Sequence, residues 1–217
     1  MIGITAVKIT DSIDTVAFET LLKFVAPSKA ERIRRFSKRI DAERSLIADT
    51  LARLLICRKL KIQNSQLKFC LNPYGKPLLE SPPDLHFNVS HSGKWVVCCI
   101  DQTPIGVDVE EMRPVDYRII ERFFSKEEAT VFFDLSEEKR EEHFFDLWTL
   151  KESYVKAIGK GLFISPSSFT VKDKGWFFKQ YSIDMSYKLS VCAMGYNFPN
   201  TINILDLGAF LNAALKI

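Results

Sequence analysis

The chain has 217 residues, of which 47% are hydrophobic and 26% are charged, and its formal net charge is +3. This composition is typical of a globular protein with a substantial core. No apolar run approaches the roughly 20 residues that cross a bilayer, and the opening MIGITAVKIT has neither a basic leader nor a small-residue cleavage site, so we expect no membrane span and no signal peptide. The five cysteines show no CxxC spacing, which favours reduced, buried thiols in a cytoplasmic protein over a disulfide framework or a zinc site.

Positive charge is concentrated between residues 29 and 44. This segment carries seven basic and three acidic side chains and is therefore +4, which exceeds the net charge of the whole chain. The basic residues are Lys29, Arg32, Arg34, Arg35, Lys38, Arg39 and Arg44. Such a local field indicates an anionic partner, for which a nucleic acid, a phosphorylated ligand and an acidic protein are candidates. The alternative is a solvated helical face that has no partner.

In the first half, residues 2–9 alternate weakly and predict a strand. Ser28 and Glu31 form a capping-box pattern that opens a short basic helix. Asp41 is the expected cap of a longer helix that runs to about residue 60. After a turn-rich segment, residues 85–90 and 95–100 read as strands joined by a turn, and residues 105–110 read as a third. Their close spacing predicts adjacent antiparallel strands.

The second half repeats this order. Ser125 and Glu128 form a second capping box, and a long helix is predicted from about residue 141 to 158, where Gly159 and Gly161 end it. Strands are predicted at 169–173, 176–183 and 187–195. The repeated order predicts a mixed α/β (α+β) fold with pseudo-twofold duplication of a unit of about 100 residues. We place the two halves at 1–104 and 105–217, with the active site between them.

The motif GVDVEEMRP (106–114) holds two carboxylates in a predicted strand. Residues two apart share a face of a strand, so Asp108 and Glu110 point one way while Val107 and Val109 point the other. Two adjacent carboxylates repel each other, and a buried unpaired charge costs several kcal/mol, so the pair needs a cation. The alternatives are lysine or arginine partners, an exposed polar face, or Mg²⁺, which prefers oxygen ligands.

The helix motif WTLKESYVKAIGKG (148–161) places Lys151 in the middle of the stripe that faces the core. Glu152 and Lys156 lie beside this stripe, one turn apart. They form either an ordinary surface pair, with Lys151 extending its ammonium to solvent, or part of a site. In such a site Glu152 supplies a third oxygen to the metal, and the two lysines meet phosphate charge.

The motif NVSHSG (88–93) places His91 in a predicted tight turn after a strand. One interpretation is a structural histidine. The other is a phosphate-binding turn, in which backbone N–H groups, hydroxyls and the imidazole contact the anion. The sequence contains no P-loop and no GxGxxG motif, so it gives no support for ATP or NAD binding through those motifs.

Four segments in this order resemble 4′-phosphopantetheinyl transferases of the surfactin-synthetase-activating type: YGKP (74–77), FNVSHSG (87–93), GVDVE (106–110) and WTLKESYVKAIGKGL (148–162). The resemblance extends from about residue 34 to about residue 195. It implies a pseudo-twofold fold of two similar halves. It also implies Mg²⁺-dependent transfer of the phosphopantetheine arm of coenzyme A to a serine of an apo carrier protein, with release of 3′,5′-adenosine bisphosphate.

The resemblance also implies roles for individual residues. Asp108, Glu110 and Glu152 would hold the magnesium ion, either Glu152 or a bound water would act as base toward the carrier serine, and Lys156 would stabilise or protonate the leaving phosphate. The implied phosphate contacts are His91, Ser90 and Lys151, the implied adenine contacts are Tyr74, Gly75, Lys76 and Pro77, and the implied contacts of the 3′-phosphate are Lys29, Arg32 and Arg44. Met112 stands where a small hydroxyl residue is expected, so one side-chain contact to the phosphates is not implied.

By the same resemblance we expect the partner to be an acyl, peptidyl or aryl carrier domain, as in nonribosomal peptide synthesis and antibiotic biosynthesis. We expect a cytoplasmic monomer that binds neither nucleic acid nor a membrane. Two other functions would use the same residues. A metal-dependent phosphodiester or pyrophosphate hydrolase would turn over its substrate without a carrier, and a non-catalytic binder of RNA or of an acidic partner would not need Asp108 or Glu152.

Overall fold

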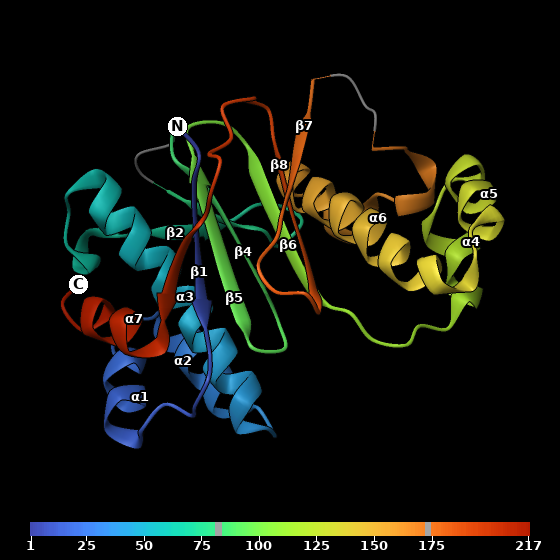
Figure 1. Cartoon of the computed structure of the whole chain (residues 1–217). Helices are drawn as coiled ribbons and strands as arrows, with labels where there is room; N and C mark the ends of the chain where they lie inside the picture. Colours follow the sequence, from blue (N-terminus) through green and yellow to red (C-terminus); the bar gives the residue numbers. More distant parts are fainter. Residues whose placement is uncertain (81–83, 172–174) are drawn as a thin grey trace.

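The computed structural model describes residues 1–80, 84–171 and 175–217, except for the side chain of Leu162 (Figure 1). The strands are β1 (Gly3–Lys8), β2 (Phe69–Leu71), β3 (Pro77–Leu79), β4 (His86–Ser92), β5 (Trp95–Asp101), β6 (Ile105–Glu111), β7 (Phe177–Tyr181), β8 (Tyr187–Ala193) and β9 (Asn203–Asp206). The α-helices are α1 (Thr15–Leu22), α2 (Pro27–Arg34), α3 (Arg39–Leu60), α4 (Ile120–Phe123), α5 (Lys126–Asp134), α6 (Glu137–Ile158) and α7 (Leu207–Ala214). Short 3-10 helices lie at Asn64–Gln66, Tyr117–Ile119, Gly161–Phe163 and Pro166–Ser168.

Within these described residues the strands form two main sheets and a small hairpin. The first sheet has the order β4-β5-β1-β9, the second has the order β6-β8-β7, and β2 pairs with β3. Neighbouring strands are antiparallel except for β1 and β9, which are parallel. The antiparallel pairing of β4 with β5 is confirmed, but the prediction that β6 joins them is wrong. Both edges of β5 are occupied by β4 and β1, so the chain leaves the first sheet and begins the second.

The two sheets repeat one unit of strand, long helix and two further strands. In the first half this unit is β1-α3-β4-β5, and in the second it is β6-α6-β7-β8, with corresponding sheet orders β4-β5-β1 and β7-β8-β6. Both long helices have 22 residues. The predicted mixed α+β duplication is thereby confirmed. The end of the chain departs from the repeat, because β9 joins the first sheet and α7 packs into the core of the first half through Leu207 and Phe210.

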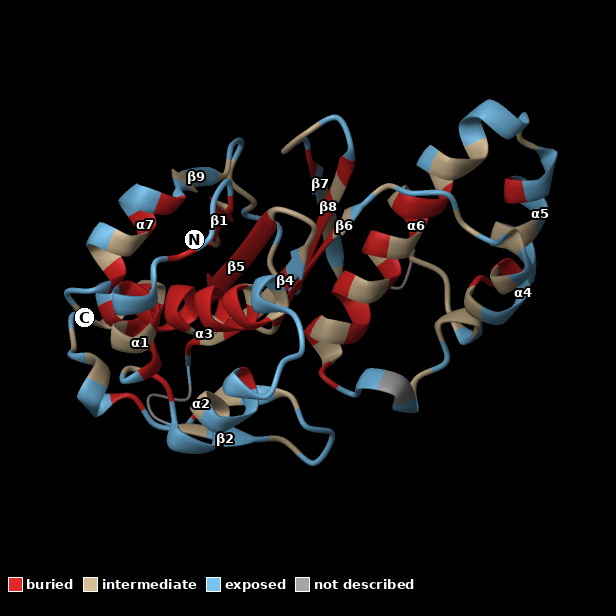
Figure 2. Ribbon diagram, turned by 90° about the horizontal axis from the view of Figure 1, so that it is seen from below, coloured by how far each residue is buried: buried red, intermediate tan, exposed pale blue. Residues whose placement is uncertain are grey.

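Alternating side chains divide the apolar interior between the sheets and the helices. On β5, Val96 and Cys98 belong to the core that α3 covers, whereas Trp95 and Val97 belong to a core shared by the two sheets. Val107 and the other inward residues of β6 complete this shared core. The opposite face of β6 therefore turns toward α6. Figure 2 shows buried positions running along α3, β5 and α6 through the middle of the molecule.

Strands β4 and β6 lie side by side, and side chains of β4 bind the backbone of β6. The acceptors are Asn88 Oδ1 for the N–H of Val107 (2.9 Å), Ser90 Oγ for the N–H of Val109 (3.3 Å) and Ser92 Oγ for the N–H of Glu111 (3.1 Å). The same hydroxyls donate to carboxylates, Ser90 to Asp108 at 3.0 Å and Ser92 to Glu110 at 2.8 Å. The alternating polar side chains of the NVSHS segment therefore join the two halves of the molecule. They also orient the carboxylates of Asp108 and Glu110.

Helix ends agree only in part with the predictions. The capping box of Ser125 and Glu128 opens α5, and α6 ends at Gly159, whose φ of 72° is left-handed, as predicted. In α2 the predicted capping box is absent, because the helix begins at Pro27 and Ser28 lies inside it. Proline is suited to a first helical position, where its missing N–H costs no hydrogen bond. Asp41 lies in the first turn of α3 rather than at its cap, because that helix begins at Arg39.

Two further local predictions are wrong. His91 lies in β4, where it pairs with Val96, and the turn starts at Gly93, whose φ of 52° suits the reversal. Residues 169–171 are not a strand, and the rest of that prediction, Lys172 and Asp173, lies outside the described residues. The strands predicted around β7 and β8 are confirmed.

Candidate active site

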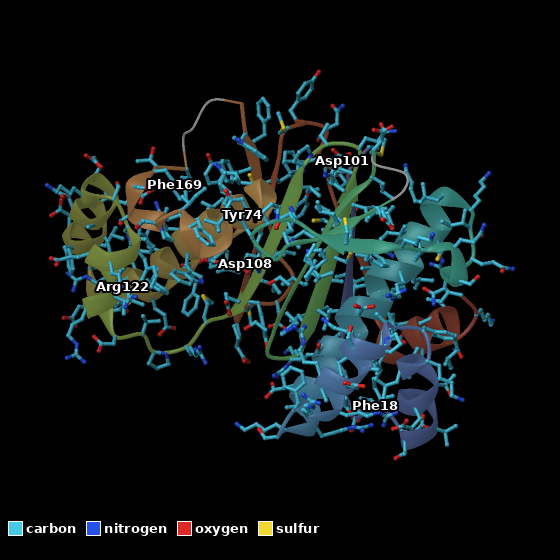
Figure 3. The ribbon with its side chains drawn as sticks, turned by 180° about the vertical axis from the view of Figure 1, so that it is seen from behind. Phe18, Tyr74, Asp101, Asp108, Arg122 and Phe169 are labelled. Atoms are coloured by element: carbon cyan, nitrogen blue, oxygen red, sulfur yellow. The ribbon has the colours of Figure 1, made fainter. Side chains whose placement is uncertain are left out.

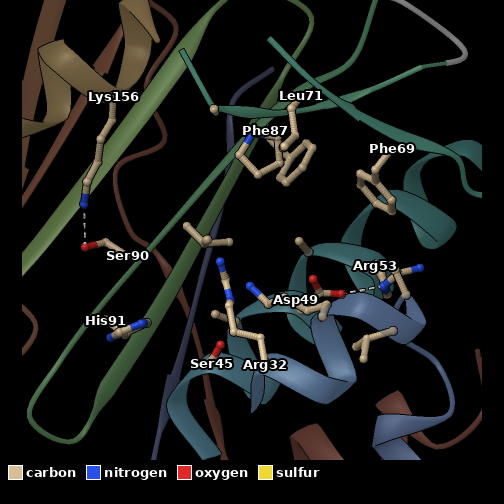
Figure 4. Close-up of a pocket in the computed structure, with 18 of the residues that line it drawn as sticks. Arg32, Ser45, Asp49, Arg53, Phe69, Leu71, Phe87, Ser90, His91 and Lys156 are labelled. Atoms are coloured by element: carbon tan, nitrogen blue, oxygen red, sulfur yellow. Dashed lines mark hydrogen bonds and ion pairs between the residues drawn. The ribbon is translucent and has the colours of Figure 1, made fainter. Parts of the chain in front are cut away.

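A cavity of about 1550 Å³ opens between the two halves. Its walls come from α2, α3, the β2–β3 hairpin, β4, β6 and α6 (Figure 4). Among the charged and polar residues that line it are Lys29, Arg32, Asp49, Arg53, Ser90, His91, Asp108, Glu110, Glu152 and Lys156. Figure 4 shows Lys156 and Ser90 on one side and Asp49 with Arg53 on the other.

Three carboxylates line the side of the cavity nearest α6. Asp108 and Glu110 come from β6 and Glu152 comes from α6. The helix approaches the strand closely because Gly106 has no side chain, and a Cβ there would lie 2.1 Å from the carbonyl oxygen of Ser153. Figure 3 shows Asp108 in the middle of the molecule, where β6 and α6 meet.

Asp108 is buried, and only one of its two carboxylate oxygens has hydrogen-bond partners among the described residues. Its Oδ1 accepts a hydrogen bond from Lys156 Nζ at 2.6 Å and one from Ser90 Oγ at 3.0 Å. Its Oδ2 is buried without a hydrogen-bond partner among the described residues. A buried carboxylate oxygen with no donor is costly, so this atom is suited to a cation.

Burial raises the pKa of each of the three carboxyl groups Asp108, Glu110 and Glu152. Burial raises the pKa of Asp108, and the charge of Lys156 opposes this rise. Burial also raises the pKa of Glu152, and the negative charge of Asp108 adds to it. Burial and the charge of Asp108 raise the pKa of Glu110, which its hydrogen bond from Ser92 opposes. When ionised, these three carboxylates therefore carry more negative charge than Lys156 alone can neutralise.

A hard divalent cation fits this cluster by the chemistry of its donors. Every acidic donor is a carboxylate oxygen, which is the ligand type that Mg²⁺ prefers, and Asp108 Oδ2 lacks a partner. In the present side-chain arrangement, no three His, Cys, Asp or Glu side chains of the described residues are grouped as a metal site. Lys156 instead provides the cation at Asp108.

The other end of the cavity is cationic. Lys29 and Arg32 of α2 line it beside Arg53, whose Nε donates to Asp49 at 2.6 Å. Burial lowers the pKa of Lys29, which the charge of Asp49 opposes. An anion bound at this end would stabilise the charged form of the lysine.

His91 of β4 also lines the cavity. Burial lowers its pKa, and the positive charges of Lys156 and Arg44 lower it further. The apolar part of the wall includes Phe69 and Phe87, whose rings meet edge to face with centroids 5.5 Å apart. The cavity thus combines an apolar wall with groups of both charges.

Comparisons with known proteins agree with this chemistry. The family model described as the 4′-phosphopantetheinyl transferase superfamily matches residues 104–191, and the model of the 4′-phosphopantetheinyl transferase N-terminal region matches residues 14–103. The 4′-phosphopantetheinyl transferase Sfp of Bacillus subtilis (strain 168) is 37% identical over 202 residues, which cover 87% of this chain and 90% of that protein. The chain belongs to the 4′-phosphopantetheinyl transferase superfamily.

Two further relatives of this transferase come from other organisms. The 4′-phosphopantetheinyl transferase gsp of Aneurinibacillus migulanus is 38% identical over 188 residues, covering 87% of this chain and 76% of that protein. A mouse L-aminoadipate-semialdehyde dehydrogenase-phosphopantetheinyl transferase is 29% identical over 155 residues, covering 65% of this chain and 50% of that protein. No helix in the described part of the transferase is long and apolar enough to cross a membrane.

Most of the predicted site residues line the cavity of the transferase. They are Lys29, Arg32, Gly75, Pro77, Ser90, His91, Asp108, Glu110, Glu152 and Lys156. Four others, Arg44, Tyr74, Lys76 and Lys151, do not line it. The ligand contacts expected of these four stay predictions, and in this structure each side chain is engaged elsewhere in the protein.

Lys151 is buried in the C-terminal half, with a relative exposure of 1%. Its Nζ donates to Glu128 Oε2 at 2.6 Å and to the carbonyl oxygen of Phe169 at 2.7 Å. The predicted phosphate contact stays a prediction, and in this structure the ammonium is engaged by a carboxylate and a carbonyl oxygen. Lys151 lies on the apolar stripe of α6, and its ammonium is paired with an anion there. This anion is the carboxylate of Glu128.

Arg44 and Tyr74 lie outside the cavity wall. Arg44 Nε donates to the carbonyl oxygen of Gly93 at 2.6 Å, and its guanidinium also pairs with Asp41, so it holds the β4–β5 turn against α3. The ring of Tyr74 packs edge to face on Phe163, with centroids 5.0 Å apart. Lys76 points toward the end of α6 and away from the cavity.

The sequence reasoning missed polar residues both in the cavity wall and beside it. Asp49 and Arg53 follow one another at helical spacing in α3, next to the basic segment, but nothing in the pattern separates them from ordinary surface pairs. Ser92, which donates to Glu110, was recognisable from the alternation of Asn88, Ser90 and Ser92 in one strand. Met112, which departs from the family pattern, packs against the small core of α4 and α5.

Proposed function

We propose that this protein transfers the 4′-phosphopantetheine arm of coenzyme A to a serine of an apo carrier protein. The observation that carries the proposal is one cavity in which a cationic end, with Lys29 and Arg32, is joined to a cluster of carboxylates and Lys156. Coenzyme A has a matching polarity, with a 3′-phosphorylated nucleotide at one end and a pyrophosphate in the middle. Membership of the transferase superfamily supports the same reaction.

The reaction exchanges one phosphorus–oxygen bond for another. The serine oxygen of the carrier attacks the phosphorus that bears the pantetheine arm, and the bond from this phosphorus to the adenosine bisphosphate breaks. The serine proton passes to a base, and 3′,5′-adenosine bisphosphate leaves with the bonding electrons. Two substrates give two products, and no oxidant or reductant is consumed.

The charge of each cavity residue determines its role in this proposal. Glu152 is the candidate base, because burial and the negative charge of Asp108 raise its pKa, and a carboxylate with a higher pKa is a stronger base. Lys156 is placed to donate to a phosphate oxygen as negative charge develops on the leaving group. Asp108, Glu110 and Glu152 would hold Mg²⁺, which when bound would neutralise the charge of the pyrophosphate.

The two halves take different parts in this proposal. Residues 1–104 supply the nucleotide end of the cavity through Lys29, Arg32, Gly75 and Pro77, with Ser90 and His91 near the phosphates. Residues 105–217 supply the carboxylates and the helix that carries Glu152 and Lys156. Because one chain builds both sides of the cavity, a monomer suffices for activity. Four of the five cysteines are buried free thiols, which supports a reducing compartment such as the cytoplasm.

The test mixes the protein with coenzyme A, Mg²⁺ and one apo carrier protein, and weighs the carrier by mass spectrometry. The expected result is a gain of one phosphopantetheine arm, lost in Asp108→Ala and Glu152→Ala. Lys139→Ala is the matched control, because Lys139 lies exposed in the first turns of α6, away from the cavity. Acyl, peptidyl and aryl carriers are tested in parallel, since their relative rates identify the preferred partner.

The alternatives give different results in the same assay. A hydrolase would release adenosine bisphosphate from coenzyme A at the same rate with and without the carrier. A non-catalytic binder would leave every carrier unmodified, and its binding would survive Asp108→Ala. Either outcome contradicts the proposal.

A further inference from the structure

The loop between β2 and β3 is attached to the end of α6, although the two come from different halves of the chain. The side chain of Asn72 accepts hydrogen bonds from the N–H groups of Tyr74 (2.9 Å) and Lys76 (2.8 Å), which closes the loop on itself. Its Nδ2 donates to the carbonyl oxygen of Gly159 at 2.7 Å. The loop is thus held in a fixed shape and fixed to the residue that ends the helix.

Lys76 makes the second connection. Its Nζ lies 2.6 Å from the carbonyl oxygen of Lys156, 3.1 Å from that of Ala157 and 3.2 Å from that of Ile105. The first two are carbonyl groups of the last turn of α6, which have no partner within the helix, and the third begins β6. An ammonium group has three N–H donors, so it can satisfy all three acceptors. Its charge also lies at the negative end of the helix dipole.

Gly159 allows this approach. Its φ of 72° is left-handed, as expected for the residue after a helix. A Cβ at this position would lie 2.7 Å from Cδ of Lys76 and 3.2 Å from Nδ2 of Asn72. The glycine is therefore required both by the backbone and by the side chains that reach over it from the other half.

We propose that the ammonium group of Lys76 positions the catalytic helix for the transfer reaction and does not bind the phosphates of the nucleotide. Its ammonium holds the last turn of α6 against β6 and thereby fixes Lys156, whose own Nζ reaches Asp108 Oδ1 at 2.6 Å. The nearest acceptor of Lys76 is the backbone carbonyl of this same Lys156. The N-terminal half thus controls the placement of a reactive lysine of the C-terminal half. This inference rests on the proposed function, because that function gives Lys156 its part in the reaction.

The test compares Lys76→Met with the wild type. Methionine keeps an unbranched stem and removes the ammonium, so the last turn of α6 loses its donors. We expect kcat for carrier loading to fall by about 10- to 100-fold, the size of effect that a displaced catalytic group causes. We expect the Kd of coenzyme A, measured by isothermal titration calorimetry, to stay within about twofold. Lys68→Met, an exposed lysine just before β2, is the matched control and should change neither quantity.

Hydrogen exchange tests the attachment without any turnover. Amides at 155–159 should exchange faster in Lys76→Met than in the wild type, because the helix end opens more often. Asn72→Ala removes the other connection and should likewise give lower kcat and faster exchange at 155–159. It keeps the inference testable if Lys76→Met does not fold. Lys76→Arg retains a charge and N–H donors, so it should recover part of the lost kcat.

The outcomes separate the two proposals. A raised Kd for coenzyme A with unchanged kcat and unchanged exchange would show that Lys76 binds the nucleotide, and would overturn the inference. Unchanged exchange at 155–159 in both variants would overturn it as well. If the wild type loads no carrier, the proposed function fails, while faster exchange in Lys76→Met would still support the attachment of the loop to α6.

Discussion

Lys156 of α6 and Asp108 of β6 form an ion pair with 2.6 Å between Nζ and Oδ1, and the second oxygen of Asp108 is buried without a partner among the described residues. The pair connects the helix that carries Glu152 to the strand that carries Glu110. It also leaves the acids of the cavity under-neutralised, since burial and their neighbours' charge raise the pKa of both glutamates. Under the proposed function, the unpartnered oxygen of Asp108 would be the atom of this pair that binds a further cation.

The substitution Asp108→Asn removes the negative charge of this side chain and keeps its size and shape. The amide oxygen can still accept from Lys156 and Ser90, so we expect the fold to be kept. Transfer to the carrier should fall by at least about 100-fold, because the proposed cation site loses a negative ligand. Stability should stay within about 1 kcal/mol, since burial of the charged form is itself unfavourable, as the raised pKa of Asp108 indicates. Carrier mass and chemical denaturation measure the two effects.

The control for this variant is Asp134→Asn, at the exposed end of α5, which should leave transfer unchanged. Full activity of Asp108→Asn would show that the carboxylate takes no part in the reaction. A large loss of stability together with lost activity would show that Asp108 is a structural residue instead.

Magnesium should stabilise the protein before any substrate binds. The three carboxylates lie in one cavity with a single lysine among them, so a bound divalent cation relieves repulsion that only the folded state experiences. We expect the melting temperature to rise with Mg²⁺ and to return on addition of EDTA, which should also stop transfer. The Asp108→Asn variant should show a much smaller rise. A melting temperature that does not respond to Mg²⁺ in the wild type would contradict the assignment of these residues as ligands.

The duplication and the carboxylate strand could be predicted because their signals are local. Alternation in GVDVE sets which side chains share a face, and the structure keeps Val107 and Val109 in the core between the sheets. The order of the strands within each sheet could not be predicted in the same way. Pairing of β6 with β8 rather than β5 depends on which edges other strands have already taken, and β1 lies about 90 residues before β5 in the chain.

The long basic side chains were the least predictable part of the site. A lysine or arginine reaches several ångströms from its Cα, so its position in the sequence does not decide which of the nearby anions and carbonyl groups it meets. Lys151 pairs with Glu128, and Arg44 binds the carbonyl oxygen of Gly93. Short side chains such as Asp108 and Ser90 stay close to the backbone, and both line the cavity. The strand pattern predicted the shared face of Asp108 and Glu110, whereas Ser90 was implied by the family resemblance.

Gly106→Ala should separate the catalytic helix from its strand. An added Cβ would lie 2.1 Å from the carbonyl oxygen of Ser153 and 2.4 Å from the N of Ala157, both backbone atoms of α6 that cannot rotate away. We expect a loss of about 1–3 kcal/mol in the free energy of unfolding, with transfer reduced as well. Gly208→Ala is the control, because its Cβ would meet nothing closer than 3.4 Å in helix α7 and should be neutral or stabilising. Equal stability of the two variants would disprove the close contact.

One thiol of the native protein should react rapidly with a disulfide reagent such as DTNB. Cys70 is exposed on β2 and lines the cavity, whereas Cys57, Cys98, Cys99 and Cys192 are buried. Burial also raises the pKa of Cys57 and Cys98, which lowers the fraction of reactive thiolate. Cys70→Ala should remove the fast phase, and coenzyme A should slow it in the wild type. More than one fast thiol would contradict the described burial.

Alkaline pH should destabilise the protein partly through Cys99. Burial raises the pKa of this thiol from 9.0 to about 12 in the folded state. Between these values the unfolded chain releases the proton while the folded protein keeps it, so the folded state binds more protons and stability falls as pH rises. The contribution of Cys99 is complete below about pH 9 and is lost progressively toward pH 12, by at most about 1.4 kcal/mol per pH unit.

Chemical denaturation at pH 8, 9 and 10 measures this slope. Tyr181 also makes the protein less stable as the pH rises, but at higher pH, because burial raises its pKa from 10.0 to about 12. Cys99→Ala should therefore reduce the slope between pH 9 and 10 without abolishing it, whereas Cys70→Ala should leave the slope unchanged, since Cys70 is exposed in the folded protein. An identical slope in the wild type and Cys99→Ala would show that the buried thiol is not a source of the alkaline sensitivity.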